Sequence, residues 1–445
     1  MVRVLLSFLL VALAVLPLPA RGGPDVEAER ATIQAALDAL AVSADRLAAL
    51  ADLYLRERRI DDAREAVEAV AEIARREHEL SDRLRALPPP PEVAEPTPVP
   101  PAPPAAGVAE CIDLGLTWLA AHQESDGAWD CDGFMKHDKV TPACDGAGNA
   151  LYDPGVTGLS LLAFLGSGDT HRHGTYRETV RKGFTYLKQI QDAEGCFGSR
   201  TSTHFTYNHA IGALAMAEAY ALTASPLFKN SAQSAVDFIL MCQNPYLAWR
   251  YGIRPQDNDT SVSGWMIMAL KSAKVAGLRV DDAGFEGMKA WLEKVTEPEY
   301  GRVGYTARGT GPARPQDLMD KYPADLSEAL TAVGILCRML MGEAPGRSEP
   351  VRKGLDLLAK CLPSWNEPRG SIDMYYWYFG TLATRLAGEE DWRGFSEALT
   401  PIFARQRTEP ASFRGSFDPL DPWGQEGGRV YSTAMMTLCA EVVHR

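Results

Sequence analysis

Two kinds of helix alternate along the chain after residue 108. The first kind is amphipathic, and the second is apolar on most faces, as expected of a helix that is buried on two sides. The stretches of the second kind are VTGLSLLAFLG (156–166), YNHAIGALAMAEAYAL (207–222), DTSVSGWMIMALKSAKVAG (259–277), DLSEALTAVGILCRMLMG (325–342), DMYYWYFGTLATRLAG (373–388) and RVYSTAMMTLCAEVV (429–443). Six amphipathic helices, each followed by a buried one, predict an all-α fold in which residues 108–445 close into an α/α toroid with the buried helices as its inner wall.

A short motif recurs at the ends of the amphipathic helices. Residues 181–197 are RKGFTYLKQIQDAEGCF, and GLTWLAAHQESDGAW (115–129) places its Gly, aromatic, Leu, Gln, Gly and aromatic at the same intervals. Weaker copies lead to Trp249, to Gly304 and Tyr305, to Trp365, and to Gly415 and Phe417. The second Gly permits a tight reversal, since positive φ costs it little, and the Gln can bond carbonyls and amides at adjoining helix ends. We therefore expect each copy to form a staple between a helix end and the following loop.

The chain before residue 108 has a different organisation. MVRVLLSFLLVALAVLPLPA (1–20) is typical of a secretory signal cleaved after Ala20, with an uncleaved anchor as the alternative. Residues 25–87 predict a helical hairpin or coiled coil that self-associates or packs on a partner; the alternative is a lone tetratricopeptide-type unit, which cannot bury its face alone. Residues 88–106 are about half Pro and predict an extended, semi-rigid linker. We expect an exported protein, periplasmic or secreted, with no membrane span beyond the leader.

Charge and cysteine content narrow the possible partners. The net charge is −13 and no cluster of Lys and Arg with interleaved aromatics is present, which argues against nucleic acid as a partner. Of the eight cysteines, Cys131 and Cys144 bracket a polar loop, so we predict a disulfide between them, with a free, solvated loop as the alternative. No Cys-x-x-Cys pair occurs, and we expect neither a metal nor another cofactor.

The motif of residues 182–197, Lys-Gly-x-x-Tyr-Leu-x-x-x-Gln-x-x-x-Gly-x-Phe, resembles the Gln-Trp motif of squalene-type cyclases. Over residues 108–445 the chain is similar to the terpene cyclase and protein prenyltransferase superfamily. It also resembles the squalene cyclase and prenyltransferase repeat proteins of bacteria, of the exported type. The resemblance implies an α/α toroid.

The catalytic residues of the superfamily are only partly present. Squalene-type cyclases protonate an alkene with the middle Asp of Asp-x-Asp-Asp-Thr, and the similar stretch 256–260 (Gln-Asp-Asn-Asp-Thr) has Asn258 at that position. Asn cannot donate a labile proton, but a shifted register leaves Asp257 and Asp259 as candidate catalytic acids. Prenyltransferases bind zinc through Asp-x-Cys and a later His; the similar positions here are Asp373, Tyr375 and Ser432, so two of three ligands are missing.

The mouth of the toroid at the starts of the inner helices is the natural place for a pocket. The candidate ligand-binding residues there are Tyr207, His209, Asp373, Tyr375, Trp377, Arg429 and Tyr431. For the aromatic residues the alternative is that they fill the barrel, and for His209 the alternative is a hydrogen-bonded core histidine.

These observations favour a non-catalytic protein that binds a protein partner or an apolar small molecule. The alternative function is a squalene-type terpene cyclase or a related lipid-modifying enzyme. Enzymatic activity remains an open alternative. The sequence weighs against it, because the fold motif is intact while both catalytic motifs are incomplete.

Overall fold

The computed structural model describes residues 71, 74–76, 78–80, 82–83, 105–202 and 204–445. The predicted signal (1–20), most of the predicted hairpin (25–87) and the linker up to residue 104 lie outside the described residues; those described between 71 and 83 are helical. Contacts divide the chain into Met1–Thr97 and Pro98–Arg445, and the second unit is described below. None of the helices in the described part has the length and apolar character needed to cross a membrane.

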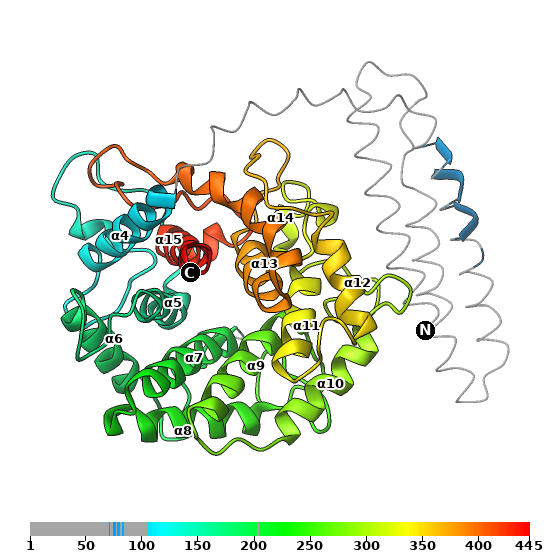
Figure 1. The fold of residues 1–445 in the computed structure, drawn as a ribbon, viewed down its shortest axis with the longest axis horizontal. Coiled ribbons are helices and arrows are strands. Elements are labelled where there is room, and N and C mark those ends of the chain that lie inside the picture. The colour runs from blue at the N-terminus through cyan, green and yellow to red at the C-terminus, as the bar shows by residue number, and fades with distance from the viewer. Residues whose placement is uncertain (1–70, 72–73, 77, 81, 84–104, 203) are drawn as a thin grey trace, which may run out of the picture. The chain divides into compact units, whose positions relative to one another are not determined.

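Twelve α-helices of the second unit form two concentric sets (Figure 1). The inner helices are α5 (Asp153–Gly166), α7 (Phe205–Thr223), α9 (Thr260–Val275), α11 (Ala329–Leu340), α13 (Met374–Ala387) and α15 (Gly424–His444). The outer helices are α4 (Ala105–Ala121), α6 (Arg177–Gln189), α8 (Pro226–Cys242), α10 (Ala283–Val295), α12 (Glu349–Leu358) and α14 (Glu389–Leu399). Each inner helix packs on the next, and α15 packs on α5, which closes the ring. The all-α toroid of six helix pairs is confirmed.

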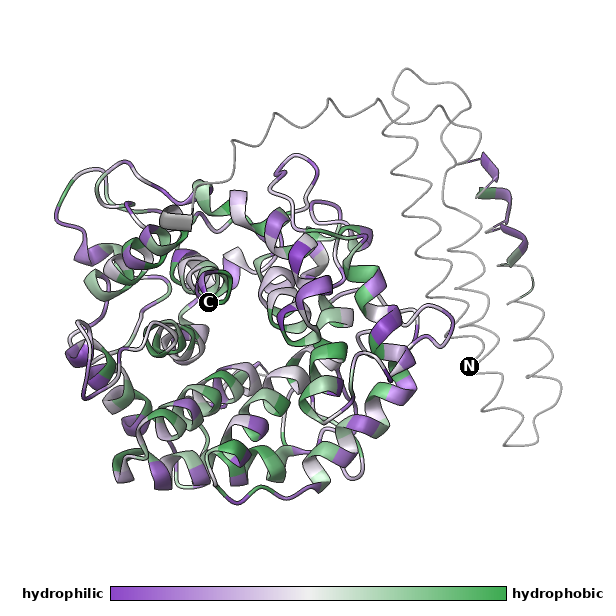
Figure 2. Cartoon of the chain, viewed as in Figure 1, coloured by the Kyte–Doolittle hydropathy of each residue, from purple (hydrophilic) through white to green (hydrophobic). Residues whose placement is uncertain are grey.

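The burial of the two sets follows the hydrophobic pattern of the sequence. In α6 the buried positions are Val180, Gly183, Phe184 and Leu187, a spacing that places them on one stripe of the helix. The inner helix α9 is buried on almost every face. Polar residues accordingly gather on the outward faces of the outer helices (Figure 2).

The recurring Gln joins neighbouring repeats. The side-chain amide of Gln191 donates to the Gly195 carbonyl (3.0 Å) and to the Ser231 carbonyl in the next outer helix, α8 (3.0 Å). Gln123 and Gln243 make the same pair of bonds, to their own loop and to α6 or α10. Gln406 does so across the closure of the ring, to Gly415 (2.9 Å) and to Cys111 in α4 (2.8 Å). Each staple therefore links a helix end, its loop and the following repeat.

In four of the staples a Gly at positive φ lies against the next outer helix. Gly195 has φ +100°, and an added Cβ would overlap the Ser234 carbonyl oxygen in α8. In the fourth copy the structure corrects our assignment of Gly304 and Tyr305. Gly301 (φ +79°) contacts α12, and Thr296 pairs with Val303 in an isolated bridge. Thr296 stands there in the place of the Gln, and its hydroxyl donates to the Leu292 carbonyl of its own helix (2.6 Å).

Candidate functional site

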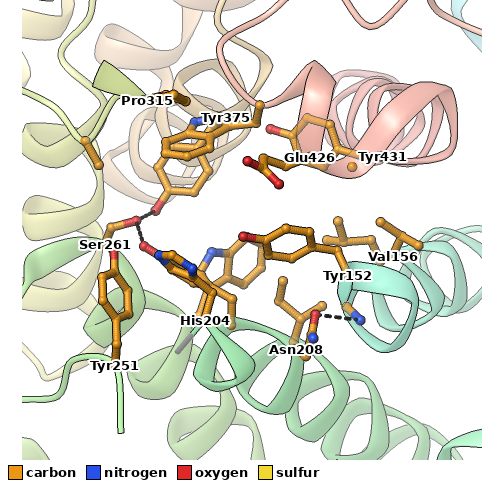
Figure 3. Close-up of a pocket in the computed structure, with 18 of the residues that line it drawn as sticks. Tyr152, Val156, His204, Asn208, Tyr251, Ser261, Pro315, Tyr375, Glu426 and Tyr431 are labelled. Atoms are coloured by element: carbon orange, nitrogen blue, oxygen red, sulfur yellow. Dashed lines mark hydrogen bonds between the residues drawn. The ribbon is translucent and has the colours of Figure 1, made fainter. Parts of the chain in front are cut away.

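A cavity of about 270 Å³ opens among the starts of the inner helices (Figure 3). Six tyrosines and two tryptophans line it: Tyr152, Tyr207, Tyr251, Tyr305, Tyr375, Tyr431, Trp265 and Trp423. Its other lining residues that bear polar side chains are His204, Asn208, Ser261, Arg314 and Glu426. The cavity is therefore a mainly aromatic site with a few polar groups, as is typical of small-molecule sites.

Helix geometry explains which residues reach the cavity. Residues four apart share a helix face, and three pairs at this spacing line the wall. The pairs are Gly155 and Leu159, Tyr207 and Ile211, and Ser261 and Trp265. Gly427 and Tyr431 also line it, on either side of a kink in α15 at the non-helical Gly428. The N-cap residues Tyr152, His204 and Trp423 complete the mouth at α5, α7 and α15, where no side chain caps the helix.

A hydroxyl network crosses one wall. Tyr207 Oη donates to Ser261 Oγ (2.9 Å), which is also 2.8 Å from Tyr375 Oη. The hydroxyl groups of Tyr251 and Tyr305 are likewise hydrogen-bonded to each other. Burial raises the pKa of Tyr207 and Tyr375 above the ordinary range of tyrosine, so both remain protonated hydrogen-bond donors.

The positive charge of Arg314, at the edge of the cavity, is balanced by a carboxylate that lies behind the cavity wall. Arg314 donates to Asp373 Oδ2 (2.6 Å), and both side chains are almost completely buried. Asp373 also accepts from Ser327 Oγ (2.7 Å) and caps α13 through the Tyr376 amide (2.9 Å). Arg314 borders the cavity and Asp373 lies one step behind it, where it fixes the guanidinium.

A buried carboxyl also lies behind Tyr431. Tyr431 Oη donates to Asp421 Oδ2 (3.3 Å), and the Trp423 amide donates to Oδ1 (3.1 Å). Burial, and to a lesser degree the nearby Asp373, raises the pKa of Asp421 to about 7. The Tyr431 side chain therefore lines the cavity, and Asp421, which does not line it, holds the Tyr431 hydroxyl in place.

The two candidate acids lie away from the cavity wall. The Asp257 side chain is 56% exposed and pairs with Arg250 (2.9 Å). Asp259 is fully buried and caps α9 by accepting from the Val262 amide (2.8 Å). Burial raises its pKa to about 7, and its second oxygen has no hydrogen-bond partner. Asn258, at the position of the cyclase acid, accepts from the Ala248 amide (2.9 Å) and so serves the loop.

Three of the predicted ligand residues occupy structural positions. His209 accepts from the Phe197 amide at Nδ1 (3.2 Å) and donates from Nε2 to the Ala235 carbonyl (3.1 Å), while burial lowers its pKa to about 3. Trp377 is fully buried and packs near Trp365. Arg429 is held by the Asp145 carbonyl (2.8 Å) and by Asp418 and Ser416. Of the predicted set, the cavity brings together Tyr207, Tyr375 and Tyr431.

The predicted disulfide between Cys131 and Cys144 is not formed, and both residues are free thiols. Cys144 Sγ donates to the Ser412 carbonyl (3.0 Å) and lies 3.6 Å from Asp138 Oδ1. Cys131 is fully buried beside Asp153, which accepts from the Cys131 amide (2.8 Å). The two thiols therefore have different neighbours, and their proximity in the sequence was not sufficient evidence for pairing.

The pattern of the sequence missed several wall residues. Tyr152, His204 and Trp423 precede inner helices, and Tyr251 and Tyr305 follow the staples. All five are aromatic residues in a loop that leads to a buried helix. An aromatic residue at such a place is the sequence feature that could have identified them as wall residues.

No model of a protein family matches the chain, and no curated protein matches it in sequence. Among solved structures it is similar to the α-1,6-mannanase of Salegentibacter sp. HEL1_6 (13% identity, TM-score 0.52, covering 76% of this chain and 100% of that one). It is also similar to cellobiose 2-epimerase from Bacillus thermoamylovorans B4167 (11% identity, TM-score 0.52, covering 76% and 98%). At such identities the likeness shows the α/α-toroid fold alone.

Proposed function

We propose that the toroid binds a small amphipathic molecule in the tyrosine-lined cavity without transforming it. The ligand would have a ring-bearing apolar body and at least one hydroxyl or other polar group. Aromatic walls offer broad apolar contact to such a body, and a few fixed polar groups set its orientation. The proposal rests on one observation, the gathering of eight Tyr and Trp side chains around a single cavity at the inner-helix starts.

The size and charge of the cavity support a small ligand. Its volume of about 270 Å³ is just below the usual range of small-molecule sites, about 300–1,000 Å³. Glu426 lines the wall and can accept from a ligand hydroxyl, while Arg314 already has a carboxylate partner. A neutral ligand with hydroxyl groups suits this wall better than a strongly anionic one.

The arrangement of acids argues against two kinds of catalysis. Glycoside hydrolysis, the activity named for the mannanases of this fold, needs two carboxyl groups that flank the substrate. Glu426 is the only carboxylate among the described residues that line the cavity. Alkene protonation needs an acid that faces an apolar cavity, and Asp257 and Asp259 both lie off its wall.

We also propose, on the sequence of residues 1–20 and 25–87, that the chain is exported and associates through its N-terminal helices. Intact mass and subunit mass of the protein from the periplasm or medium test both points. A full-length cytoplasmic monomer would refute them.

Native mass spectrometry and calorimetry test the cavity. We expect the purified full chain to retain, or to bind with micromolar or better affinity, a member of a panel of cyclic alcohols and phenols. Val156→Phe places a ring into the cavity and should abolish this binding, because Val156 lines the wall. The control Val275→Phe alters a residue of α9 that is 74% exposed and should bind normally.

Two results would contradict the proposal. One is that no panel member or retained molecule is found; the other is that Val156→Phe, still folded by circular dichroism, binds as well as the wild type. Conversion of a bound panel member to a new product would favour the alternative of an enzyme.

A further inference from the structure

Three side chains with metal-binding atoms converge at one point away from the tyrosine-lined cavity. His122 follows α4, Asp138 follows the short 3-10 helix Phe134–His137, and Cys144 lies in the next loop. Their donor atoms, Nε2, a carboxylate oxygen and Sγ, all lie within 4.8 Å of one another. The side chains of His122 and Asp138 are 5% and 2% exposed, and Cys144 is 6% exposed. The cluster is thus buried and contains the three ligand types that zinc prefers.

The hydrogen bonds of His122 leave its outer nitrogen available. Nδ1 lies 2.7 Å from the Trp118 carbonyl oxygen, which can only accept, so Nδ1 carries the hydrogen. In the neutral ring Nε2 then has a lone pair, and it points at Asp138 Oδ1, another acceptor, at 3.1 Å. A second proton on the ring would join the two atoms as an ion pair, and a metal cation bound between them would satisfy both acceptors in the same way. A carbonyl that holds Nδ1–H is also the usual support of a metal-binding histidine.

Two of the three distances between the donor atoms match those of a tetrahedral ion, and the third, between His122 and Cys144, is within 4.8 Å. Zinc bonds of about 2.0 Å to nitrogen and oxygen and about 2.3 Å to sulfur require N···O edges of about 3.3 Å and O···S edges of about 3.5 Å. The observed edges are 3.1 Å from Nε2 to Oδ1 and 3.6 Å from Oδ1 to Sγ. Stacking of the His122 ring on Trp118, with centroids 4.0 Å apart, holds the nitrogen in place.

We propose that His122, Asp138 and Cys144 form a structural site for a divalent transition-metal ion of the zinc class. The fourth ligand would be the Ser412 carbonyl oxygen, which lies 3.0 Å from Cys144 Sγ and also accepts from Trp118 Nε1 (2.9 Å). Binding converts the Cys144 thiol to a thiolate and releases its proton to solvent. With Asp138 and Cys144 as anions, the two charges of the ion are balanced in the buried site.

The site differs from both a prenyltransferase zinc site and a Cys–His–Asp catalytic triad. The prenyltransferase positions correspond to Asp373, Tyr375 and Ser432, on the inner helices. A triad histidine uses one nitrogen for the nucleophile and the other for the acid. Here the Trp118 carbonyl occupies Nδ1, so a single nitrogen faces both Asp138 and Cys144.

The position of the cluster suggests its role. Ser412 belongs to the last repeat, and it also bonds Trp118 of α4 and Pro142. An ion bound there would fasten the first repeat to the last, at the closure of the ring. We expected no metal because the sequence has no closely spaced pair of cysteines, whereas His122, Asp138 and Cys144 span 23 residues.

Metal analysis of the full chain, purified without chelator, tests the proposal. We expect about one zinc per chain, and its removal should lower the melting temperature reversibly. Cobalt added to the metal-free protein should give a thiolate-to-cobalt charge-transfer band. Cys144→Ser should lose that band and Asp138→Asn should lose the metal. Cys242→Ser, which alters an equally buried thiol at the end of α8, should keep both.

The cobalt spectrum keeps the test valid if a variant folds poorly, because it is recorded on the wild-type chain. Absence of both zinc in the purified protein and a cobalt band would overturn the proposal. So would full metal content in folded Cys144→Ser and Asp138→Asn. These results are independent of ligand binding in the tyrosine-lined cavity.

Discussion

The staple at Gln191 gives the sharpest test of how the repeats are joined. Its amide donates to the carbonyls of Gly195 and Ser231, and its carbonyl accepts from Ser231 Oγ (2.6 Å). Gln191→Ala removes all three bonds. Gln191→Glu keeps the size of the side chain but replaces the donor by an oxygen that faces two carbonyl oxygens, so it should be at least as destabilising.

The magnitude follows from the number of bonds. At about 1 kcal/mol for each net hydrogen bond, and somewhat less for a half-buried group, the loss is about 2–3 kcal/mol. Unfolding entropy of about 2.1 cal/mol/K per residue over about 340 residues is about 0.7 kcal/mol/K. The melting temperature should therefore fall by about 3–4 °C.

Calorimetric or circular-dichroism melting of the full chain measures the effect. Gln189→Ala is the matched control, since Gln189 is an exposed residue on the last turn of the same helix, and it should melt within about 1 °C of the wild type. If Gln191→Glu and Gln189→Ala melted together with the wild type, the staple would contribute nothing and the account of the repeat would be wrong.

Two further predictions concern the ring closure and the buried acids. Gly415→Val should destabilise the toroid more than Gly309→Val. Gly415 (φ +97°) lies against the Leu114 carbonyl, whereas Gly309, also at positive φ, faces open space. Equal melting temperatures of the two variants would contradict this prediction. The pKa of Asp421, raised to about 7, means that the stability associated with this group is complete below about pH 4 and is lost as the pH rises through 7. Asp421→Asn should reduce that loss in urea unfolding between pH 4 and pH 8, and an unchanged pH profile of this variant would refute the assignment.

The architecture could be predicted from sequence because its determinants are local. In the clearest copies, such as 181–197, the helix stripe, the Gln and the Gly lie within about 20 residues, and this spacing predicts the staple. The partner of the Gln is not local. Gln406 bonds Cys111, 295 positions away, so only the folded ring shows that the same contact closes it.

The cavity wall was harder to predict for a geometric reason. Successive helical residues differ by about 100° in direction, so a run such as 375–378 cannot indicate which aromatic faces the axis until the helix is oriented. Tyr375 lines the cavity, whereas Trp377 packs outward near Trp365. Loop residues such as Tyr251 depend on the path of the chain after a staple, which carries no periodic pattern.

His209, Asp259 and Asp373 look functional in the sequence, but each accepts a hydrogen bond from a backbone amide of the fold. In five repeats the amide of the residue that ends the staple donates to a side chain on the following inner helix. The acceptors are Thr157, His209, Ser263, Thr331 and Thr433. At this position His209 accepts the same backbone hydrogen bond that Thr or Ser accepts in the other repeats. Asp259 and Asp373 also have structural roles, as the N-caps of α9 and α13.

The structural roles of His209, Asp259 and Asp373 bear on the function of the toroid. A group that is already committed to a backbone amide in a buried position cannot approach a substrate without breaking the fold that holds it. What remains free to meet a ligand is the set of aromatic rings and hydroxyls at the mouth, with Glu426 as the accompanying acid. A wall of that composition offers contact and orientation, which is why we propose binding, rather than chemistry, as the function of this toroid.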